Sequence, residues 1–452
     1  MALSDLHLAD LHDRAQRAGI ARFRMLTRDE LIAALEGETA PEGDATPADE
    51  TAPQDEESRP KRRRRRAREA DHDADVVAGA PRESEVAEAG SPIEGEPARE
   101  REPEPEAPVE TEDVSGVLDR LPQGYGFLRL HGLEPAEGDV YVSASQIRRC
   151  ELLPGDEVAG PARGPRRGEH HRALVHVASV NGQEPEGDRV TFEDLTPVAP
   201  HRRVPLGESA EPIARAVDLL APLALGQRVL VLAEPRSGRT TLLRAVAAAI
   251  AGGDAHLRVL LADERPEEVT EWRRGLPNAE IVAAPADQEP GDQVRAAELA
   301  IGNAKRRAEA GEDVVVIIDS LSRLALGYRD PNRVKRLFGA GRELAEDGSG
   351  SLTVIATVLD SDERGDEVRE LLETTENALL RLDASLASQG IVPSLLVSET
   401  RASGEERLRS DEELAAVRAL RAELDELDPA DAARLIGERI TASGSNAELL
   451  GL

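Results

Sequence analysis

The 452-residue chain has little sulfur and few aromatic rings: one cysteine, Cys150, and eight aromatic side chains (one Trp, three Tyr, four Phe). A single cysteine excludes an internal disulfide framework and a Cys-based zinc site, so nothing in the sequence favours an oxidising compartment. With aromatics at 2%, cores must rest on Leu, Val, Ile and Ala. The position of each aromatic residue therefore becomes informative.

Long apolar runs are also missing, since no stretch approaches the ~20 consecutive apolar residues of a membrane span. The N-terminus carries Asp5, Asp10 and Asp13 and lacks the basic-then-apolar order of a signal peptide. We therefore expect a soluble, cytoplasmic protein with no membrane partner. The net charge of −32, from 56 basic and 88 acidic residues, disfavours nucleic-acid binding by the chain as a whole. Any such surface must be local.

Two segments precede the first strand-like pattern. Residues 1–36 carry leucines at helical spacing, which predicts a small helical module. Residues 37–113 contain 24 acidic and 11 basic residues and no aromatic, which is typical of a disordered linker. Within this linker, the run from Arg59 to Arg68 is either a phosphate-binding segment or a solvated charge run, and both interpretations remain open.

The remainder predicts a multidomain fold of the α+β and α/β classes. In residues 114–186, short apolar runs at 116–118, 126–128, 140–142, 157–159 and 173–175 are separated by Gly, Pro and Asp. This spacing is typical of a small β-barrel of the OB or cold-shock type. In residues 187–452, apolar runs alternate with helical patterns, as a mostly parallel sheet requires.

Three of the eight aromatics, Tyr125, Phe127 and Tyr141, fall in the predicted barrel. Tyr125 and Phe127 alternate along one strand, so both rings point to one face, with Arg129 two places further on that face. Bases stack on such rings with ~1–3 kcal/mol each. The pattern favours an RNA-binding surface; the alternative is that the rings fill the barrel core.

A phosphate-binding loop is predicted where the run 229–232 is followed by residues 233–241 and a helical pattern. A strand, a tight loop and a helix N-terminus together direct backbone N–H groups at phosphates. Against the template G-x-x-x-x-G-K-[ST], Ala233 replaces the first Gly and Arg239 replaces the Lys, while Thr240 keeps the hydroxyl for Mg²⁺. Because Arg differs from Lys in bulk and geometry, we expect nucleotide binding to survive more readily than turnover.

Two carboxylates complete this candidate site. Asp319 ends the apolar run 314–318, where a Walker B residue holds Mg²⁺; the alternative is an ordinary buried strand that ends in Asp. Glu264 follows the run 259–261 at the same predicted sheet edge, where it can polarise an attacking water.

Five segments resemble, in this order, the Rho family of bacterial transcription termination factors. They are residues 124–129 (Gly-Tyr-Gly-Phe-Leu-Arg), 140–149 (Val-Tyr-Val-Ser-Ala-Ser-Gln-Ile-Arg-Arg), 192–197, 263–271 and 318–324. The resemblance covers nearly the whole chain outside the linker, including residues 1–36. The linker itself looks like the insertion of high-GC actinobacterial members.

The resemblance implies a RecA-like, homohexameric, RNA-dependent ATPase and 5′ to 3′ helicase. Such a protein binds single-stranded nascent RNA and releases it from the RNA polymerase elongation complex, with ATP and Mg²⁺ as cofactors. The implied catalytic residues are Arg239, Glu264 and Asp319, and the metal residues are Thr240 and Asp319. The implied nucleotide contacts are Ala224, Leu225, Gly226, Gln227, Arg228, Val229, Arg236, Ser237, Gly238, Arg239, Thr240, Thr241 and Arg265. The implied RNA contacts are Tyr125, Phe127, Arg129, Tyr141, Glu169, His171 and Arg364, with His171 where the family usually has an aromatic.

The chain departs from the family pattern at residues that take part in the family's catalytic cycle. The long pore loop is reduced to Arg329–Arg336, Val397 stands at the arginine-finger position and Ala384 at a second interface arginine. Arginine fingers contribute about 10³ to 10⁵ in rate. Two hypotheses follow: a Rho-type ATPase that terminates transcription, or a Rho-like paralogue that binds RNA and acts as a regulator or subunit partner. A generic P-loop ATPase leaves the barrel aromatics unexplained.

Overall fold

The computed structural model describes residues 110–452 except 186–188, 329, 347 and 361–362; for residues 363–364 it describes the backbone only. The helical module predicted for residues 1–36, and nearly all of the linker predicted for 37–113, lie outside the described residues. The first described strand, β1, begins at Thr111, inside the segment predicted to be linker.

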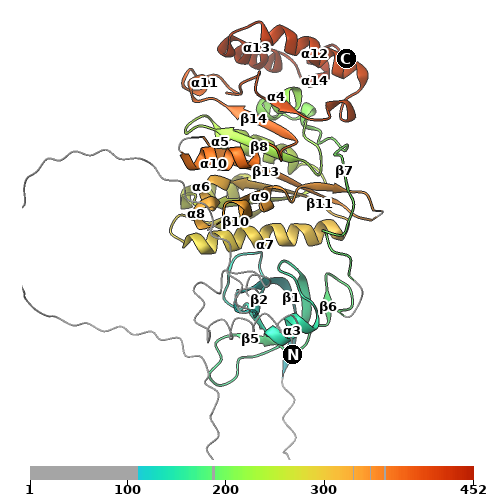
Figure 1. The fold of residues 1–452 in the computed structure, drawn as a ribbon, viewed down its shortest axis with the longest axis vertical. Helices are drawn as coiled ribbons and strands as arrows, with labels where there is room; N and C mark the ends of the chain where they lie inside the picture. Colours follow the sequence, from blue (N-terminus) through green and yellow to red (C-terminus); the bar gives the residue numbers. More distant parts are fainter. Residues whose placement is uncertain (1–109, 186–188, 329, 347, 361–362) are drawn as a thin grey trace, which may run out of the picture. The chain divides into compact units, whose positions relative to one another are not determined.

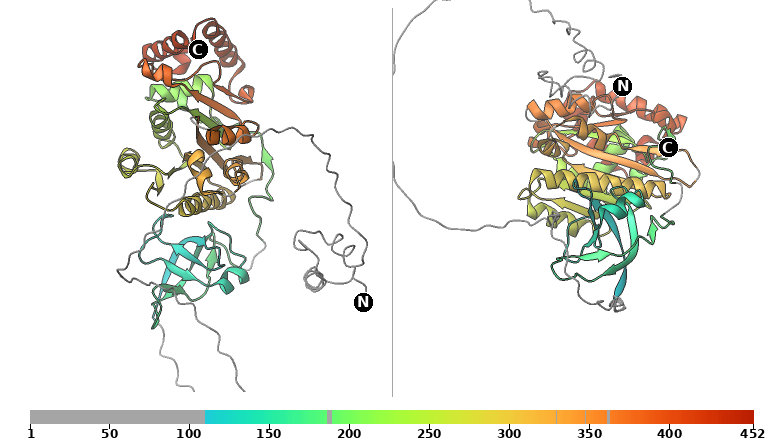
Figure 2. Two further views of the ribbon diagram at one scale, coloured as in Figure 1. Left: turned by 60° about the vertical axis from the view of Figure 1, so that its left-hand side comes forward. Right: turned by 60° about the horizontal axis from the view of Figure 1, so that its bottom comes forward.

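The N-terminal described domain is a closed β-barrel (Figure 2). Antiparallel pairing of β1 with both β2 and β4, together with the β2–β3, β3–β5 and β5–β4 pairs, closes the sheet on itself. Its aliphatic core includes Leu118, Leu128, Val140 and Val158. The elements are β1 (Thr111–Arg120), β2 (Gly126–Arg129), β3 (Val140–Val142), α3 (Ala144–Arg149), β4 (Glu157–Arg163), β5 (Arg172–Leu174) and β6 (Ser179–Val180). The predicted fold class is confirmed for this domain.

The second domain contains a sheet in the order β10-β9-β11-β13-β8-β14-β15, of which all but β15 run parallel. Two short strands lie off this order: β12 pairs with the first residues of β13, and β7 pairs with β12. The strands are β7 (Pro197–Val198), β8 (Arg228–Ala233), β9 (His256–Ala262), β10 (Glu280–Ala284), β11 (Asp313–Asp319), β12 (Arg342–Leu344), β13 (Ser351–Leu359), β14 (Ala378–Leu382) and β15 (Arg401–Ala402). The predicted α/β class is confirmed.

Helices cover both faces of this sheet (Figure 1). Along β8, Val229 and Val231 join one hydrophobic core while Leu230 and Leu232 join the other, because successive side chains point to opposite faces. The first core includes residues of α4 (Pro212–Leu220), α5 (Arg239–Ile250), α6 (Pro266–Gly275), α12 (Asp411–Asp425) and α13 (Pro429–Ala442). The second includes α7 (Pro290–Glu309), α8 (Leu321–Gly327), α9 (Asn332–Phe338) and α10 (Glu363–Leu372). Burial on both faces explains the near-continuous apolar strand runs.

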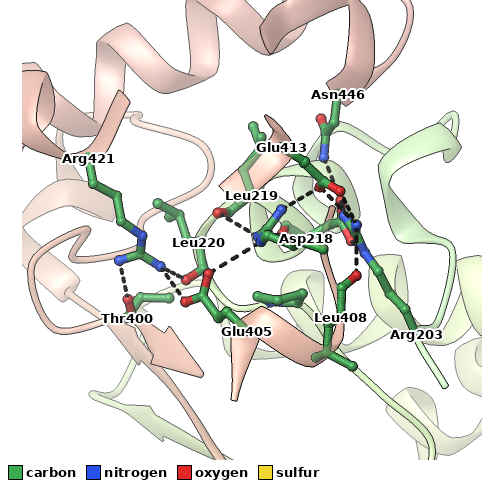
Figure 3. Close-up of polar contacts among 12 residues, drawn as sticks. Arg203, Asp218, Leu219, Leu220, Thr400, Glu405, Leu408, Glu413, Arg421 and Asn446 are labelled. Atoms are coloured by element: carbon green, nitrogen blue, oxygen red, sulfur yellow. Dashed lines mark hydrogen bonds and ion pairs between the residues drawn. The ribbon is translucent and has the colours of Figure 1, made fainter. Parts of the chain in front are cut away.

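The C-terminal helices are attached to α4 through buried polar groups (Figure 3). Asp218 of α4, fully buried, pairs with Arg203 at 2.6 Å and accepts a hydrogen bond from Asn446 at 2.9 Å. Arg421 of α12 donates to the carbonyl oxygen of Leu220. A buried carboxylate needs such partners, so this network fixes α12 and the end of the chain against α4.

The remaining elements are α11 (Ala384–Ser388), α14 (Asn446–Leu450) and the 3₁₀ turns η3 (Leu206–Glu208) and η4 (Glu405–Arg407). None of the helices described is both long and apolar enough to cross a membrane.

The barrel and the α/β domain make direct contacts within one compact unit. Asn303 of α7 donates its side-chain N–H to the carbonyl oxygen of Gly155 at 2.9 Å. A Cβ atom at Gly155 would lie 2.2 Å from the backbone nitrogen of Asn303, and φ of Gly155 is +89°. Only glycine fits this approach without strain.

Candidate functional site

Four rings gather beside strands β2 and β3 of the barrel: Tyr125, Phe127, Tyr141 and His171, which we name the ring cluster. The Tyr125–Tyr141 and Phe127–Tyr141 centroids are 5.5 and 6.0 Å apart, and Phe127–His171 is 4.9 Å. The three aromatic rings are half-buried and His171 is exposed. The aliphatic core described for the barrel holds none of them, so the alternative that the rings fill the core is wrong.

Arg129, a predicted RNA contact, lies largely buried in the barrel. Arg129 is 6% exposed. Its guanidinium forms ion pairs with Asp119 and with Asp139, and its carbon Cζ lies 5.9 Å from the Phe127 ring centroid. The alternation along β2 correctly placed Arg129 on the face of Phe127. It did not reveal the two carboxylates, which come from β1 and from the residue before β3.

Glu169, predicted to contact a base, forms a bidentate ion pair with Arg163, with N–O distances of 2.6 and 2.8 Å. The hydrogen bond from Arg163 and a second from the backbone N–H of Arg166 lower the pKa of Glu169 to about 2. Glu169 therefore stays ionised and shapes its loop. Together with Tyr141, Arg163 and His171, it lines a surface hollow with a volume of about 950 Å³. Its contact with a base stays a prediction.

The predicted phosphate loop connects β8 to α5. Gly238, with φ of +89°, is the N-cap residue of α5. Two contacts with the C-terminal part of the chain brace the loop: Ser394 donates its hydroxyl to the carbonyl oxygen of Ser237 at 2.5 Å, and Glu234 accepts from the backbone N–H of Ala384 at 3.0 Å. No pattern in the sequence links residues so far apart, and Ser394 was not predicted.

Arg239, Glu264 and Asp319 converge at the carboxyl end of the sheet. Nη2 of Arg239 lies 2.6 Å from Oε1 of Glu264, and Nε lies 3.2 Å from Oδ1 of Asp319. Thr357 of β13 donates its hydroxyl to the same Asp319 oxygen at 2.8 Å. The three elements that carry the triad, α5, the β9–α6 connection and β11, therefore place one cation between two carboxylates.

Burial raises the pKa of both carboxylates, Glu264 and Asp319. Asp319 is 1% exposed, and desolvation raises its pKa above the ordinary value. Desolvation also raises the pKa of Glu264, and the negative charge of Asp319 adds to the effect. Arg239 opposes both shifts because its charge favours the ionised carboxylates.

The residues that would hold Mg²⁺ do not fit that ion in this arrangement. Oδ1 of Asp319 already faces Arg239 and Thr357, and Oε1 of Glu264 accepts from Arg239. Mg²⁺ needs oxygen ligands at about 2.0–2.1 Å in near-octahedral geometry. A guanidinium paired with both carboxylates occupies the approach that such an ion requires. Thr240, the other predicted Mg²⁺ ligand besides Asp319, lies in the first turn of α5.

Several predicted nucleotide contacts lie elsewhere. Residues 224–229 stand before and at the start of β8, at the opposite end of that strand from the phosphate loop. The strand has six residues, so the separation is roughly 20 Å. Ala224, Gln227 and Val229 are buried, and Gln227 accepts from the backbone N–H of Ala224 at 3.0 Å. The role of residues 224–229 as nucleotide contacts stays a prediction; within one chain they lie at the end of β8 opposite the phosphate loop.

The other predicted residues differ in exposure. Arg236 is exposed with φ of +64°, and Arg265 is exposed beside Glu268 at 3.5 Å. The side chain of Arg364, in α10, lies outside the described residues. Val397, at the expected finger position, is buried in the core that also holds α5.

A closed barrel with an external ring cluster, joined to a parallel α/β domain with a phosphate loop, defines a class of nucleotide-binding proteins with an attached nucleic-acid-binding barrel. Residues 114–186 match the family described as "Rho termination factor, RNA-binding domain". Residues 214–338 match the "ATP synthase alpha/beta family, nucleotide-binding domain".

Curated relatives narrow this class to one family. A "Transcription termination factor Rho" of Chromobacterium violaceum is 38% identical over 360 residues, covering 73% of this chain and 85% of the relative. That of Bacillus subtilis is 39% identical over 336 residues, covering 68% and 78%. That of Streptomyces lividans is 40% identical over 364 residues; the match covers 75% of this chain and 51%, about half, of the relative's length. The chain belongs to the transcription termination factor Rho family.

Proposed function

We propose that the chain binds single-stranded nascent RNA on the ring cluster and couples this to ATP bound at the phosphate loop, so as to terminate transcription. In this proposal it acts in the cytoplasm as a homohexamer on the RNA polymerase elongation complex, with RNA-dependent 5′ to 3′ translocation. The single observation that carries the proposal is the presence in one chain of two features: clustered rings outside the barrel core and the convergence of Arg239, Glu264 and Asp319. The family relatives named as termination factors support it.

The barrel side of the proposal rests on stacking and charge. Tyr125 and Phe127 offer ring faces to bases, each worth ~1–3 kcal/mol. Arg149 and Arg166, which line the hollow together with Tyr141 and His171, attract the RNA backbone although the whole chain is acidic.

The proposed binding and hydrolysis of ATP depend on the phosphate loop and on Glu264. Backbone N–H groups of residues 238–241, at the N-terminus of α5, are suited to hold phosphates. A carboxylate with a raised pKa is a better proton acceptor at neutral pH, so Glu264 is suited to take the proton of a water that attacks the terminal phosphate. The expected Mg²⁺ would need the Asp319 carboxylate, which pairs with Arg239, so no step is assigned to the ion.

A second function, that of an RNA-binding regulator or subunit partner, is favoured by the position of Arg239 and by Val397. The guanidinium of Arg239 is directed at the carboxylates, and Val397 is buried in a hydrophobic core where the resemblance led us to expect an arginine. Loss of an arginine finger alone can cost about 10³ or more in rate.

RNA-stimulated phosphate release by the full chain separates the two functions. The Glu264→Gln variant serves as the inactive control, and Glu267→Gln, an exposed carboxylate in the first turn of α6, as the matched control. Release above the Glu264→Gln level supports the ATPase. RNA binding with release no greater than that of Glu264→Gln supports the regulator. A chain that neither binds RNA nor releases phosphate contradicts both.

A further inference from the structure

In the cleft, a single guanidinium, that of Arg239, lies between two acidic side chains. Glu264 and Asp319 come from different strand ends, and each directs an oxygen at a separate nitrogen of Arg239, at 2.6 and 3.2 Å. The Arg239 side chain is 17% exposed and Asp319 1%, so these charges meet largely out of water. Two ionised carboxylates that both reach one guanidinium would repel each other in its absence, so the charge of Arg239 stabilises both.

We propose that the guanidinium of Arg239 replaces the divalent cation of this cleft, so that the chain binds a nucleoside triphosphate without Mg²⁺. This inference rests on the proposed nucleotide binding and specifies its cation requirement. Arg239 is permanently charged and planar, with donors arranged as a fork, so Nε and Nη2 serve the two carboxylates while Nη1 serves a phosphate oxygen.

The charges around the loop agree with this assignment. A Lys at position 239 would be a compact point charge with no planar fork. It would reach the phosphates and leave Asp319 and Glu264 unpaired, which is the condition in which carboxylates and phosphates together hold Mg²⁺. Arg236 and Arg265, both exposed near the ends of α5 and α6, supply further positive charge for phosphates.

The Arg239→Lys substitution therefore tests the assignment directly. Arg244→Lys is the matched control, because Arg244 lies on the same helix and pairs with Glu268 and Glu271, away from the triad. Affinity of the full chain for a fluorescent ATP analogue is measured by anisotropy, once with excess EDTA and once with millimolar Mg²⁺. A nucleotide-free Mn²⁺ titration followed by electron paramagnetic resonance is run in parallel.

We expect the affinities of the natural chain and of Arg244→Lys to change less than about tenfold on adding Mg²⁺, and that of Arg239→Lys to rise by more than that factor. We also expect Arg239→Lys to gain a Mn²⁺ site that a second change, Asp319→Asn, removes.

A gain above tenfold for the natural chain, or equal responses of the natural chain and Arg239→Lys, would overturn the assignment. Failure of the natural chain to bind the analogue in either buffer refutes the proposed nucleotide binding instead. The Mn²⁺ titration then decides the cation question: a site in the natural chain that Asp319→Asn removes overturns the role of Arg239, and a site that appears only in Arg239→Lys supports it.

Discussion

Nη1 of Arg129 lies 2.5 Å from Oδ2 of Asp139, inside the barrel wall that carries the ring cluster. The same guanidinium also pairs with Asp119 of β1. Because these three residues come from β1, β2 and the start of β3, one buried cation holds together the strands that position Tyr125, Phe127 and Tyr141. Arg129 is thus a positioning residue for the ring cluster.

Replacement of Arg129 is expected to destabilise the barrel more than it weakens RNA contacts. Removing one partner of a buried ion pair costs about 3–5 kcal/mol, since Asp139 would lose its cation and Asp119 would keep only Arg295, at 3.7 Å. Hydrogen exchange of the barrel amides in Arg129→Ala should rise, while exchange in Arg148→Ala, an exposed arginine of α3, should stay as in the natural chain. Unchanged protection in Arg129→Ala would contradict the positioning role.

The ring cluster predicts a loss of RNA binding that spares the nucleotide site. The double change Tyr125→Ala and Phe127→Ala removes two stacking faces, each worth ~1–3 kcal/mol, so affinity for single-stranded RNA should fall by at least about tenfold. Fluorescence anisotropy with labelled RNA measures this, and His131→Ala, an exposed ring outside the cluster, is the control. Equal RNA affinity in the double variant would show that the rings do not stack on bases.

An acid-sensitive contribution to stability is expected at Glu280 of β10. Burial alone would raise its pKa, but the hydrogen bond with His256 and the charge and hydrogen bonds of Arg258 outweigh burial and lower the pKa to about 2. A depressed carboxyl pKa stabilises the fold above the unfolded value of 4.5, and this contribution is lost as the pH falls toward 2.

Glu280→Gln should therefore lower the free energy of unfolding at neutral pH by roughly 3 kcal/mol, because buried Arg258 loses its carboxylate partner. The difference from the natural chain should shrink as the pH is lowered below 4.5. Urea unfolding followed by the fluorescence of the chain's one tryptophan, buried Trp272, reports on this domain. A difference that stays constant with pH would contradict the ion-pair account.

The contact between the domains predicts that Gly155 does not tolerate a side chain. In Gly155→Ala the new Cβ would meet the backbone of Asn303 at 2.2 Å, and the backbone would keep an unfavourable positive φ. We expect limited proteolysis to release the barrel from the α/β domain faster in this variant than in the natural chain. Gly164→Ala, which meets nothing within 4 Å, is the control. Equal proteolysis of both variants would argue against this contact.

Local sequence patterns predicted several of the central strands of the α/β domain. The apolar runs at 229–232, 259–261 and 314–318 correspond to β8, β9 and β11. Alternation and run length reflect which faces of a strand are buried, and that is a short-range property. The carboxyl ends of parallel strands meet at one edge of a sheet. Glu264 and Asp319, which follow or end such strands, were therefore predicted to lie at the same edge, and they meet there beside Arg239.

The sequence by itself determined the order of the domains, the strand runs and the residues at the sheet's carboxyl edge. Only the tertiary structure decided that Arg129 is buried between Asp119 and Asp139, that Arg239 pairs with two carboxylates, and that residues 224–229 lie at the far end of β8. These facts depend on charges brought together from elements distant along the chain. Burial makes such charges pair, and periodicity along a single strand or helix contains no information about the partner.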